Sequence, residues 1–178
     1  MGDSLSIVFT IILAVLVMFL FPMMDTFERQ DDLSYMAVYT ATVDFVDAVR
    51  NTGTLTVDMY NSYLAQIQST GNLFDVTMEH REYKVVPAGD GASEVVYLYH
   101  YTSEIEKELN SKDSTDKDGN LLKKGGLYTF NKGDYFYVSI KNRNKTQATL
   151  MEETIYATHI DSFRIGVPYG GQIKSSYR

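Results

Sequence analysis

The segment from Ser114 to Gly119 has the spacing that comes nearest to a metal site in this chain of 178 residues. Ser114, Asp116 and Asp118 place oxygen ligands at alternate positions before a glycine, as in the first half of a calcium loop. The twelfth position of such a loop carries a bidentate glutamate, and here that position is Gly125. Because the strongest ligand is missing, the pattern favours an Asp-Gly turn in a solvated loop.

The three histidines are the other candidate metal ligands. His80, His100 and His159 have no second histidine four residues away, so a zinc site would have to be assembled from distant strands. The chain has 0 cysteines, which excludes disulfides, thiolate metal sites and cysteine nucleophiles. No glycine-rich phosphate loop follows a predicted strand. We therefore predict that the chain is not an enzyme and that it holds no metal or cofactor.

The charge balance disfavours nucleic acid as a partner. The chain has 16 Lys and Arg residues against 23 Asp and Glu residues, a formal net charge of −7. A protein that binds nucleic acid neutralises phosphates with clustered cations, and that excess of cations is missing here.

The apolar N-terminal segment predicts a membrane anchor. Leu5 to Met24 is a run of 20 residues without a charge, and at about 1.5 Å per residue it matches the roughly 30 Å hydrocarbon core of a bilayer. Residues 1–4 contain no Lys or Arg, and residues 20–24 offer no small residues for a signal peptidase. We predict a single uncleaved span in the cell membrane. Residues 1–24 form a cytoplasmic stub and transmembrane helix, and residues 25–178 an extracytoplasmic α+β domain.

The sequence predicts that the helix continues beyond the membrane to about residue 51. No proline or glycine occurs between Asp25 and Asn51, and the Asn51-Thr52-Gly53 segment is a typical helix end. A kink or local melting is expected at Pro22. Most of the outer half is apolar, so it must be covered either by the rest of the chain or by another subunit. The apolar positions are Tyr35, Met36, Val38, Tyr39, Val43, Phe45, Val46 and Val49.

The remaining pattern predicts an α+β fold, in which the long helix packs on a small antiparallel β-sheet of four to six strands with two or three short helices. Helices are expected at 57–68, capped by Thr56, and near 103–109 and 146–157. Strands are expected at 74–86, with a break at Pro87, and at 94–101 and 163–167. Segments 127–130 and 135–141 are predicted to pair as a hairpin, and residues 169–171 to form a turn.

This layout resembles that of type IV pilin-like proteins. The segment from Ala41 to Met78 is similar to the TadE-type minor pseudopilins of tight-adherence (Flp) pilus systems, and it reads ATVDFVDAVRNTGTLTVDMYNSYLAQIQSTGNLFDVTM. The segments GDYFYVSIKN and VPYGGQI are similar to the C-terminal parts of such proteins. One departure is that the residues after Gly2 lack the glutamate of pilin-type leaders.

The resemblance implies a structural or assembly role in a pilus or secretion apparatus. The implied partners are the lipid bilayer, other pilin-like subunits in a homo- or hetero-oligomer, and a polytopic membrane assembly platform. Two alternatives remain open: an extracytoplasmic subunit of another membrane complex, and a membrane-tethered ligand-binding or adhesion domain, for which a pocket lined by the tyrosines would be the sign. The predicted subunit interface consists of Pro22, Asp25, Phe27, Glu28, Val38 and Val46.

Overall fold

The protein consists of a long N-terminal helix packed on a four-stranded antiparallel sheet. The computed structural model describes residues 2–88, 92–115, 121–160 and 164–177. It confirms the predicted α+β class, with three short helices and a main sheet in the strand order β3-β2-β7-β8. In chain order the elements are α1 (Gly2–Thr52), β1 (Thr54–Thr56), α2 (Val57–Gln68), β2 (Phe74–Ala88), β3 (Ala92–Tyr101), α3 (Thr102–Leu109), β4 (Ser114–Thr115), β5 (Leu121–Lys123), β6 (Leu127–Thr129), β7 (Tyr135–Asn142), α4 (Gln147–Tyr156) and β8 (Gly166–Gln172).

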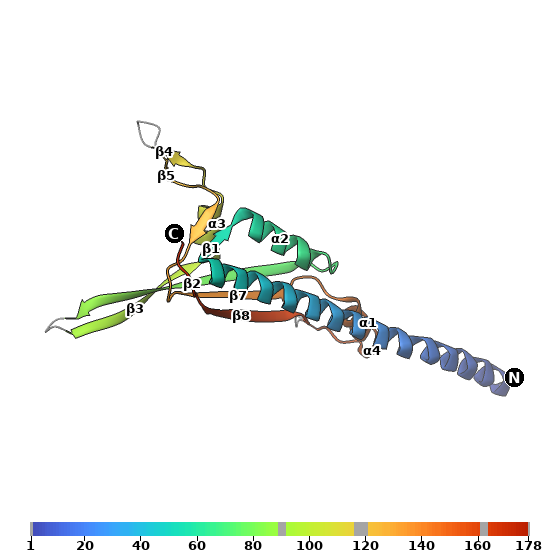
Figure 1. The fold of residues 1–178 in the computed structure, drawn as a ribbon. Helices are drawn as coiled ribbons and strands as arrows, with labels where there is room; N and C mark the ends of the chain where they lie inside the picture. The colour runs from blue at the N-terminus through green and yellow to red at the C-terminus, as the bar shows by residue number, and fades with distance from the viewer. Residues whose placement is uncertain (1, 89–91, 116–120, 161–163, 178) are drawn as a thin grey trace.

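α1 is one helix of 51 residues that projects far beyond the sheet at its N-terminal end (Figure 1). It continues through Pro22 without the local melting expected there, and the hydroxyl of Thr26 donates to the Pro22 carbonyl at 2.8 Å. The helix ends at Gly53, which has a φ of +69°. A side chain on Gly53 would come within 2.3 Å of the Ser175 carbonyl oxygen, so only glycine fits this turn.

Two strand pairings differ from the prediction. β6 pairs with β1, as Leu55 lies opposite Tyr128, whereas β7 pairs with β2 and β8. The expected 127–141 hairpin is therefore wrong. The glycines of the expected 169–171 turn lie within β8, which begins after the predicted strand start at 163. A side chain on Gly170 would meet the Tyr137 ring at 2.6 Å, and one on Gly171 would meet Arg50 at 2.7 Å, so close neighbours account for these glycines.

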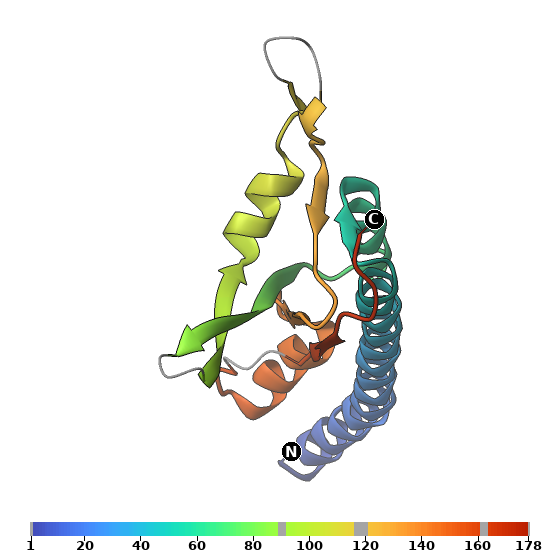
Figure 2. The same ribbon diagram turned by 60° about the vertical axis from the view of Figure 1, so that its left-hand side comes forward.

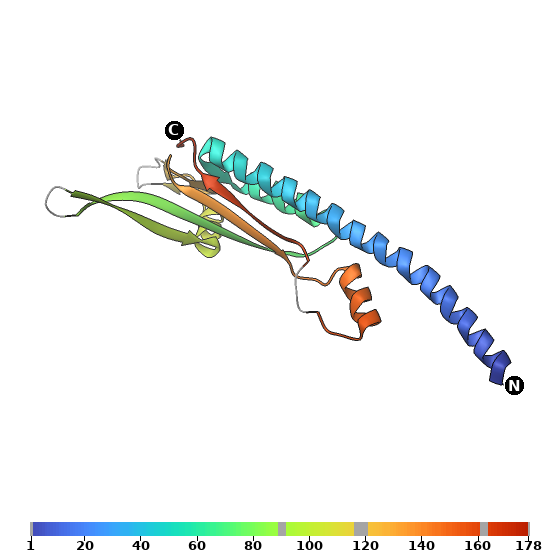
Figure 3. The same cartoon turned by 90° about the horizontal axis from the view of Figure 1, so that it is seen from below.

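β2 and β3 form a hairpin that extends past the rest of the sheet, away from the N-terminus (Figures 1 and 3). β2 pairs with β7 only from Phe74 to Arg81, whereas its pairing with β3 continues to Ala88. The strand therefore runs through Pro87, where the sequence predicted a break. Pro87 is tolerated because this end of β2 lacks a partner on its other side within the described residues.

The core lies between one face of the sheet and the helices α1 and α2, which lie side by side (Figure 2). Phe45 of α1 stacks on Tyr63 of α2 with ring centroids 4.3 Å apart, and it meets the edge of Phe136 of β7. Apolar burial of this kind is the main source of stability in a chain without disulfides. Other core residues are Val38, Val46, Val49, Leu55, Ile67, Met78, Phe130, Val138, Ile140 and Val167.

Candidate functional site

The segment from Ser114 to Gly119, which resembles the first half of a calcium loop, lies partly outside the described residues. Asp116 and Asp118 lie outside the described residues, and β4 and β5 pair on either side of them. Within the described part of the chain, no group of three or more His, Asp or Glu side chains is arranged to hold a metal ion.

Two of the histidines are neighbours that the sequence spacing did not reveal. The β2–β3 register places His80 opposite His100, and their rings stack with centroids 5.3 Å apart. His80 Nε2 lies 3.0 Å from Asp134 Oδ2, and His80 Nδ1 lies 2.8 Å from the Tyr128 hydroxyl. Because a carboxylate only accepts hydrogen bonds, Nε2 carries the proton and Nδ1 accepts from Tyr128. The 20-residue separation of the two histidines hides this pairing in the sequence.

The His80 cluster is a closed, buried network. Asp134 also accepts from the backbone N–H groups of Asn131, at 2.8 Å, and Tyr83, at 2.9 Å. His80 and Asp134 are both buried. Both carboxylate oxygens of Asp134 therefore accept hydrogen bonds from the protein, which favours a structural role in joining β2 to the turn before β7.

Acidification is expected to destabilise the folded chain through His80. Burial lowers the pKa of His80, although the adjacent Asp134 carboxylate opposes this shift, while nearby His100 adds to it and Glu82 counters it. Below about pH 6.5 the unfolded histidine binds a proton that the folded one resists, so stability falls as pH decreases.

Urea unfolding at pH 7.5 and 5.5 should show this loss. A His80→Gln variant should show a weaker pH dependence; an equal slope in both proteins would contradict the assignment.

The predicted interface residues Val38 and Val46 lie inside the chain's own core. Both side chains are 0% exposed. The same face of α1 buries Ala41, Phe45 and Val49 against the sheet and α2. A partner subunit therefore has no surface of Val38 or Val46 to contact, and these two residues belong to the fold. The helical periodicity predicted several apolar faces, but it did not indicate which of them packs against the domain.

The side of α1 that faces away from its own domain carries exposed apolar side chains. Leu33 and Met36 are 68% and 65% exposed. Ala37, Thr40 and Ala48 are exposed on the same side of the helix, and Asp44 is exposed between Thr40 and Ala48, so this side carries one charge. We call Leu33, Met36, Ala37, Thr40, Asp44 and Ala48 the outer face of α1. Its small residues would allow a second helix to approach closely.

The other predicted interface residues lie near the point where α1 leaves the apolar run. Pro22 and Asp25 are exposed, and Asp25 pairs with Arg29 at 3.1 Å within the helix. Phe27 and Glu28 are half-buried. These four residues remain candidates for a subunit contact, and Pro22 and Asp25 are the more accessible of them.

Polar contacts hold α4 against the segment of α1 around Asp31. Thr146, the N-cap of α4, donates to Asp31 of α1 at 2.6 Å and accepts from the backbone N–H of Thr149. Arg164 pairs with Glu152 of α4 and lies 3.9 Å from Asp31. The hydrogen-bonded Glu152 carboxylate, with Asp31 nearby, raises the pKa of the Arg164 guanidinium. The cluster holds α4 against α1 just outside the apolar run.

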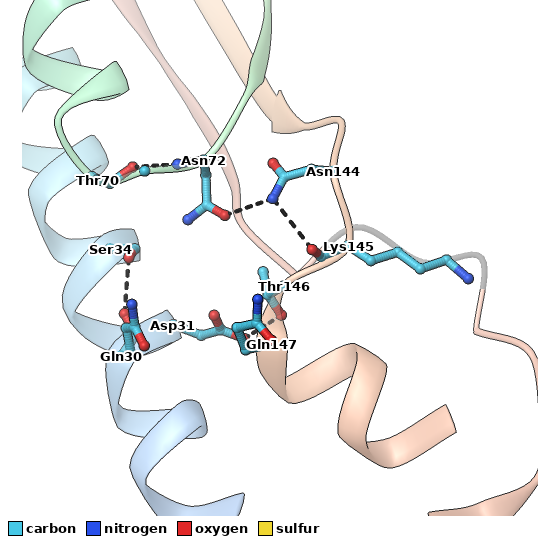
Figure 4. Close-up of a pocket in the computed structure, with 10 residues that line it drawn as sticks. Gln30, Asp31, Ser34, Thr70, Asn72, Asn144, Lys145, Thr146 and Gln147 are labelled. Atoms are coloured by element: carbon cyan, nitrogen blue, oxygen red, sulfur yellow. Dashed lines mark hydrogen bonds between the residues drawn. The ribbon is translucent and has the colours of Figure 1, made fainter. Parts of the chain in front are cut away.

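A polar pocket of about 150 Å³ lies beside this junction, between α1, the turn after α2 and the loop before α4 (Figure 4). Asn144 donates to the Asn72 side chain at 2.9 Å and accepts from the Leu73 backbone N–H at 2.7 Å. Since most of the polar groups that line the pocket bond to one another, it is better described as a structural junction than as a ligand site. The lining residues are Gln30, Asp31, Ser34, Thr70, Gly71, Asn72, Asn144, Lys145, Thr146 and Gln147.

Six tyrosines share the face of the sheet opposite the core. Directly opposed residues of an antiparallel sheet point to the same side, and Tyr83 pairs with Tyr97 while Arg81 pairs with Tyr99 and Tyr135. The guanidinium of Arg81 lies 5.6 Å from the centre of the Tyr99 ring. The tyrosines are 39–55% exposed, and the polar pocket beside α4 is lined by other residues. It consists of Tyr83, Tyr97, Tyr99, Tyr101, Tyr135 and Tyr137.

Comparison of the chain with protein-family models, curated proteins and solved structures gives no match. The functional argument therefore depends on the fold and its surfaces. Among these, α1 is long and apolar enough to cross a membrane, and its apolar run is exposed throughout, which is compatible with a membrane anchor or a signal sequence.

Proposed function

We propose that the protein is a membrane-anchored, non-enzymatic structural or assembly subunit of the pilin-like type, a TadE-type minor pseudopilin of a pilus or secretion apparatus. Its N-terminus is cytoplasmic and the domain from residue 25 is extracytoplasmic. The observation that carries the proposal is the outer face of α1. Leu33 and Met36 extend apolar surface beyond the predicted membrane span on the side that the chain's own domain leaves uncovered.

The fold supports this function because the part of α1 beyond the predicted membrane span can contact two neighbours at once. One side of it completes the core through Val38, Phe45 and Val46, and the other side remains available for a helix of another subunit. A helix contact of this kind joins copies or related subunits without requiring any catalytic group. An extracytoplasmic subunit of another membrane complex would use the same face with a different partner.

An adhesion domain is the second candidate function, and the tyrosine face favours it. Tyrosines supply rigid, amphipathic contact area at low entropic cost, which suits recognition of another surface. The six tyrosines are partly exposed, and none of them lines the polar pocket of about 150 Å³ in the described part of the chain. In this case the tyrosines, and not the outer face of α1, would be required for activity.

Cysteine crosslinking in the native membrane tests the proposed packing. Because the chain contains 0 cysteines, Met36→Cys introduces one reactive thiol. We expect a maleimide–benzophenone reagent attached to this thiol to give a crosslinked species with a second subunit on irradiation, because this reagent needs no thiol on the partner. Val46→Cys, at a position that is 0% exposed, should give none.

Leu73→Cys is the matched control for exposure. Leu73 is 59% exposed and lies in the loop before β2, so it is not part of the outer face of α1. Crosslinking of Met36→Cys that does not exceed that of Leu73→Cys would contradict a subunit contact at this face.

A further inference from the structure

α4 lies beyond the end of the sheet, on the side of the N-terminus, next to α1 (Figure 3). Its first turn is fixed to Asp31 through Thr146, whereas its last turn reaches a lower part of α1. There Ile155 and Tyr156 share an apolar groove of about 240 Å³ with Val17, Leu20, Phe21 and Met24. α4 therefore descends beside α1 from the polar junction to the apolar run.

This groove lies at membrane depth if the apolar run of α1 crosses a bilayer. Val17 is seven residues before Met24, which corresponds to about 10 Å along the helix axis. The predicted span from Leu5 to Met24 fills the roughly 30 Å hydrocarbon core, so its last eight residues, from Val17 to Met24, occupy the outer leaflet. The end of α4 is beside them.

The composition of α4 matches this placement. Residues 154–158 contain no charged side chain, and the Thr154 hydroxyl donates to the Leu150 carbonyl at 2.8 Å, so it does not require water. Ile155 and Tyr156 are nevertheless 43% and 64% exposed. Tyrosine is enriched at membrane–water interfaces, because its ring is apolar and its hydroxyl is polar.

Both acidic side chains of α4 already have partners within the protein. Glu152 pairs with Arg164, and Glu153 accepts from Lys145 at 2.6 Å and from the Ile160 backbone N–H at 2.7 Å. The helix therefore divides into a charged upper part held by protein contacts and an uncharged lower part with exposed apolar side chains. This division follows the axis from water into the membrane.

We infer that the last turn of α4 inserts into the outer leaflet and that lipid acyl chains occupy the groove between Ile155, Tyr156 and α1. The inference rests on the proposed membrane anchoring and adds a second contact with the bilayer. Lipid is the occupant because the groove is continuous with the exposed apolar surface of the predicted span. Two contacts fix the orientation of the domain relative to the membrane, which a single helix would leave variable.

Quenching of single tryptophans by brominated lipids tests the inference. The chain contains 0 tryptophans, so each substitution gives one reporter in the full-length protein. The variants are Tyr156→Trp and Ile155→Trp on α4, Phe19→Trp in the predicted span, and Tyr99→Trp on β3. Each is reconstituted at low density in phosphatidylcholine–phosphatidylglycerol vesicles with or without bromine on the acyl chains. We expect the α4 and span reporters to lose more than half of their emission and Tyr99→Trp to be unchanged.

Three results would overturn the inference. Quenching of Phe19→Trp alone, with both α4 reporters behaving like Tyr99→Trp, would mean that the chain is anchored while α4 stays in water. Loss of α4 quenching at higher protein density, with Phe19→Trp still quenched, would make a second copy the occupant of the groove. An unquenched Phe19→Trp would remove the membrane anchor itself, and with it both the inference and the localisation proposed above.

Discussion

Met36→Glu is expected to abolish incorporation of the chain into the proposed assembly while leaving the domain folded. Met36 is 65% exposed, and methionine and glutamate have similar helix propensities, so the substitution should change the stability of the isolated chain by less than about 0.5 kcal/mol. In a helix–helix contact the new carboxylate would be buried without a partner, which costs several kcal/mol. Each 1.4 kcal/mol lowers the binding constant about tenfold. The measurement is the amount of the variant recovered in a purified assembly.

Leu73→Glu provides the matched control, since it places the same charge at another exposed leucine outside the outer face of α1. It should be incorporated like the unmodified chain. Incorporation of Met36→Glu at the level of Leu73→Glu would exclude this face as the contact. Loss of activity on substitution of Tyr97 or Tyr99, with Met36→Glu fully active, would instead favour the adhesion function.

Asp134→Ala is expected to cause the largest loss of stability among the polar substitutions in the described core. The carboxylate is 1% exposed and accepts from His80 and from the backbone N–H groups of Asn131 and Tyr83. Its removal leaves one buried donor, on His80, and two part-buried backbone donors without an acceptor, and we expect a loss of about 3 kcal/mol in the free energy of unfolding. Urea unfolding of the full chain in mild detergent, followed by near-ultraviolet circular dichroism, measures this loss.

Asp134→Asn separates the charge from the hydrogen bonds. The amide oxygen can still accept from the backbone, so the asparagine variant should be more stable than the alanine variant. A loss below about 1 kcal/mol for Asp134→Ala, the size of an ordinary substitution, would contradict the role assigned to this network.

The helix ends that depend on a capping side chain or a glycine were predicted correctly from the sequence. α2 occupies Val57–Gln68 as expected, because the Thr56 side chain caps it by accepting from the Met59 N–H at 3.2 Å. α1 also ends close to the predicted position, since Gly53 adopts the left-handed conformation that terminates a helix. Capping and glycine conformation act over a few residues and are therefore visible in a single sequence.

The pairings and surfaces that depend on distant residues were not predictable in this way. β6 pairs with β1 because the turn after α1 brings the Gly53 carbonyl within 2.9 Å of the Phe130 N–H, a contact between segments 77 residues apart. The His80–Asp134 network likewise depends on strand register. For α1, the apolar pattern indicated a helix that needs wide coverage, but only the docked sheet distinguishes buried Val46 from exposed Met36.

The continuity of α1 has a mechanical consequence. A helix of 51 residues is a rod of about 75 Å, and its last part is built into the core through Phe45 and Val49. A tilt of about 10° at the membrane end would displace the other end by about 13 Å, given that length. An assembly platform that binds the apolar end of α1 could therefore move the whole sheet, either sideways by tilting the helix or outward by shifting it along its axis.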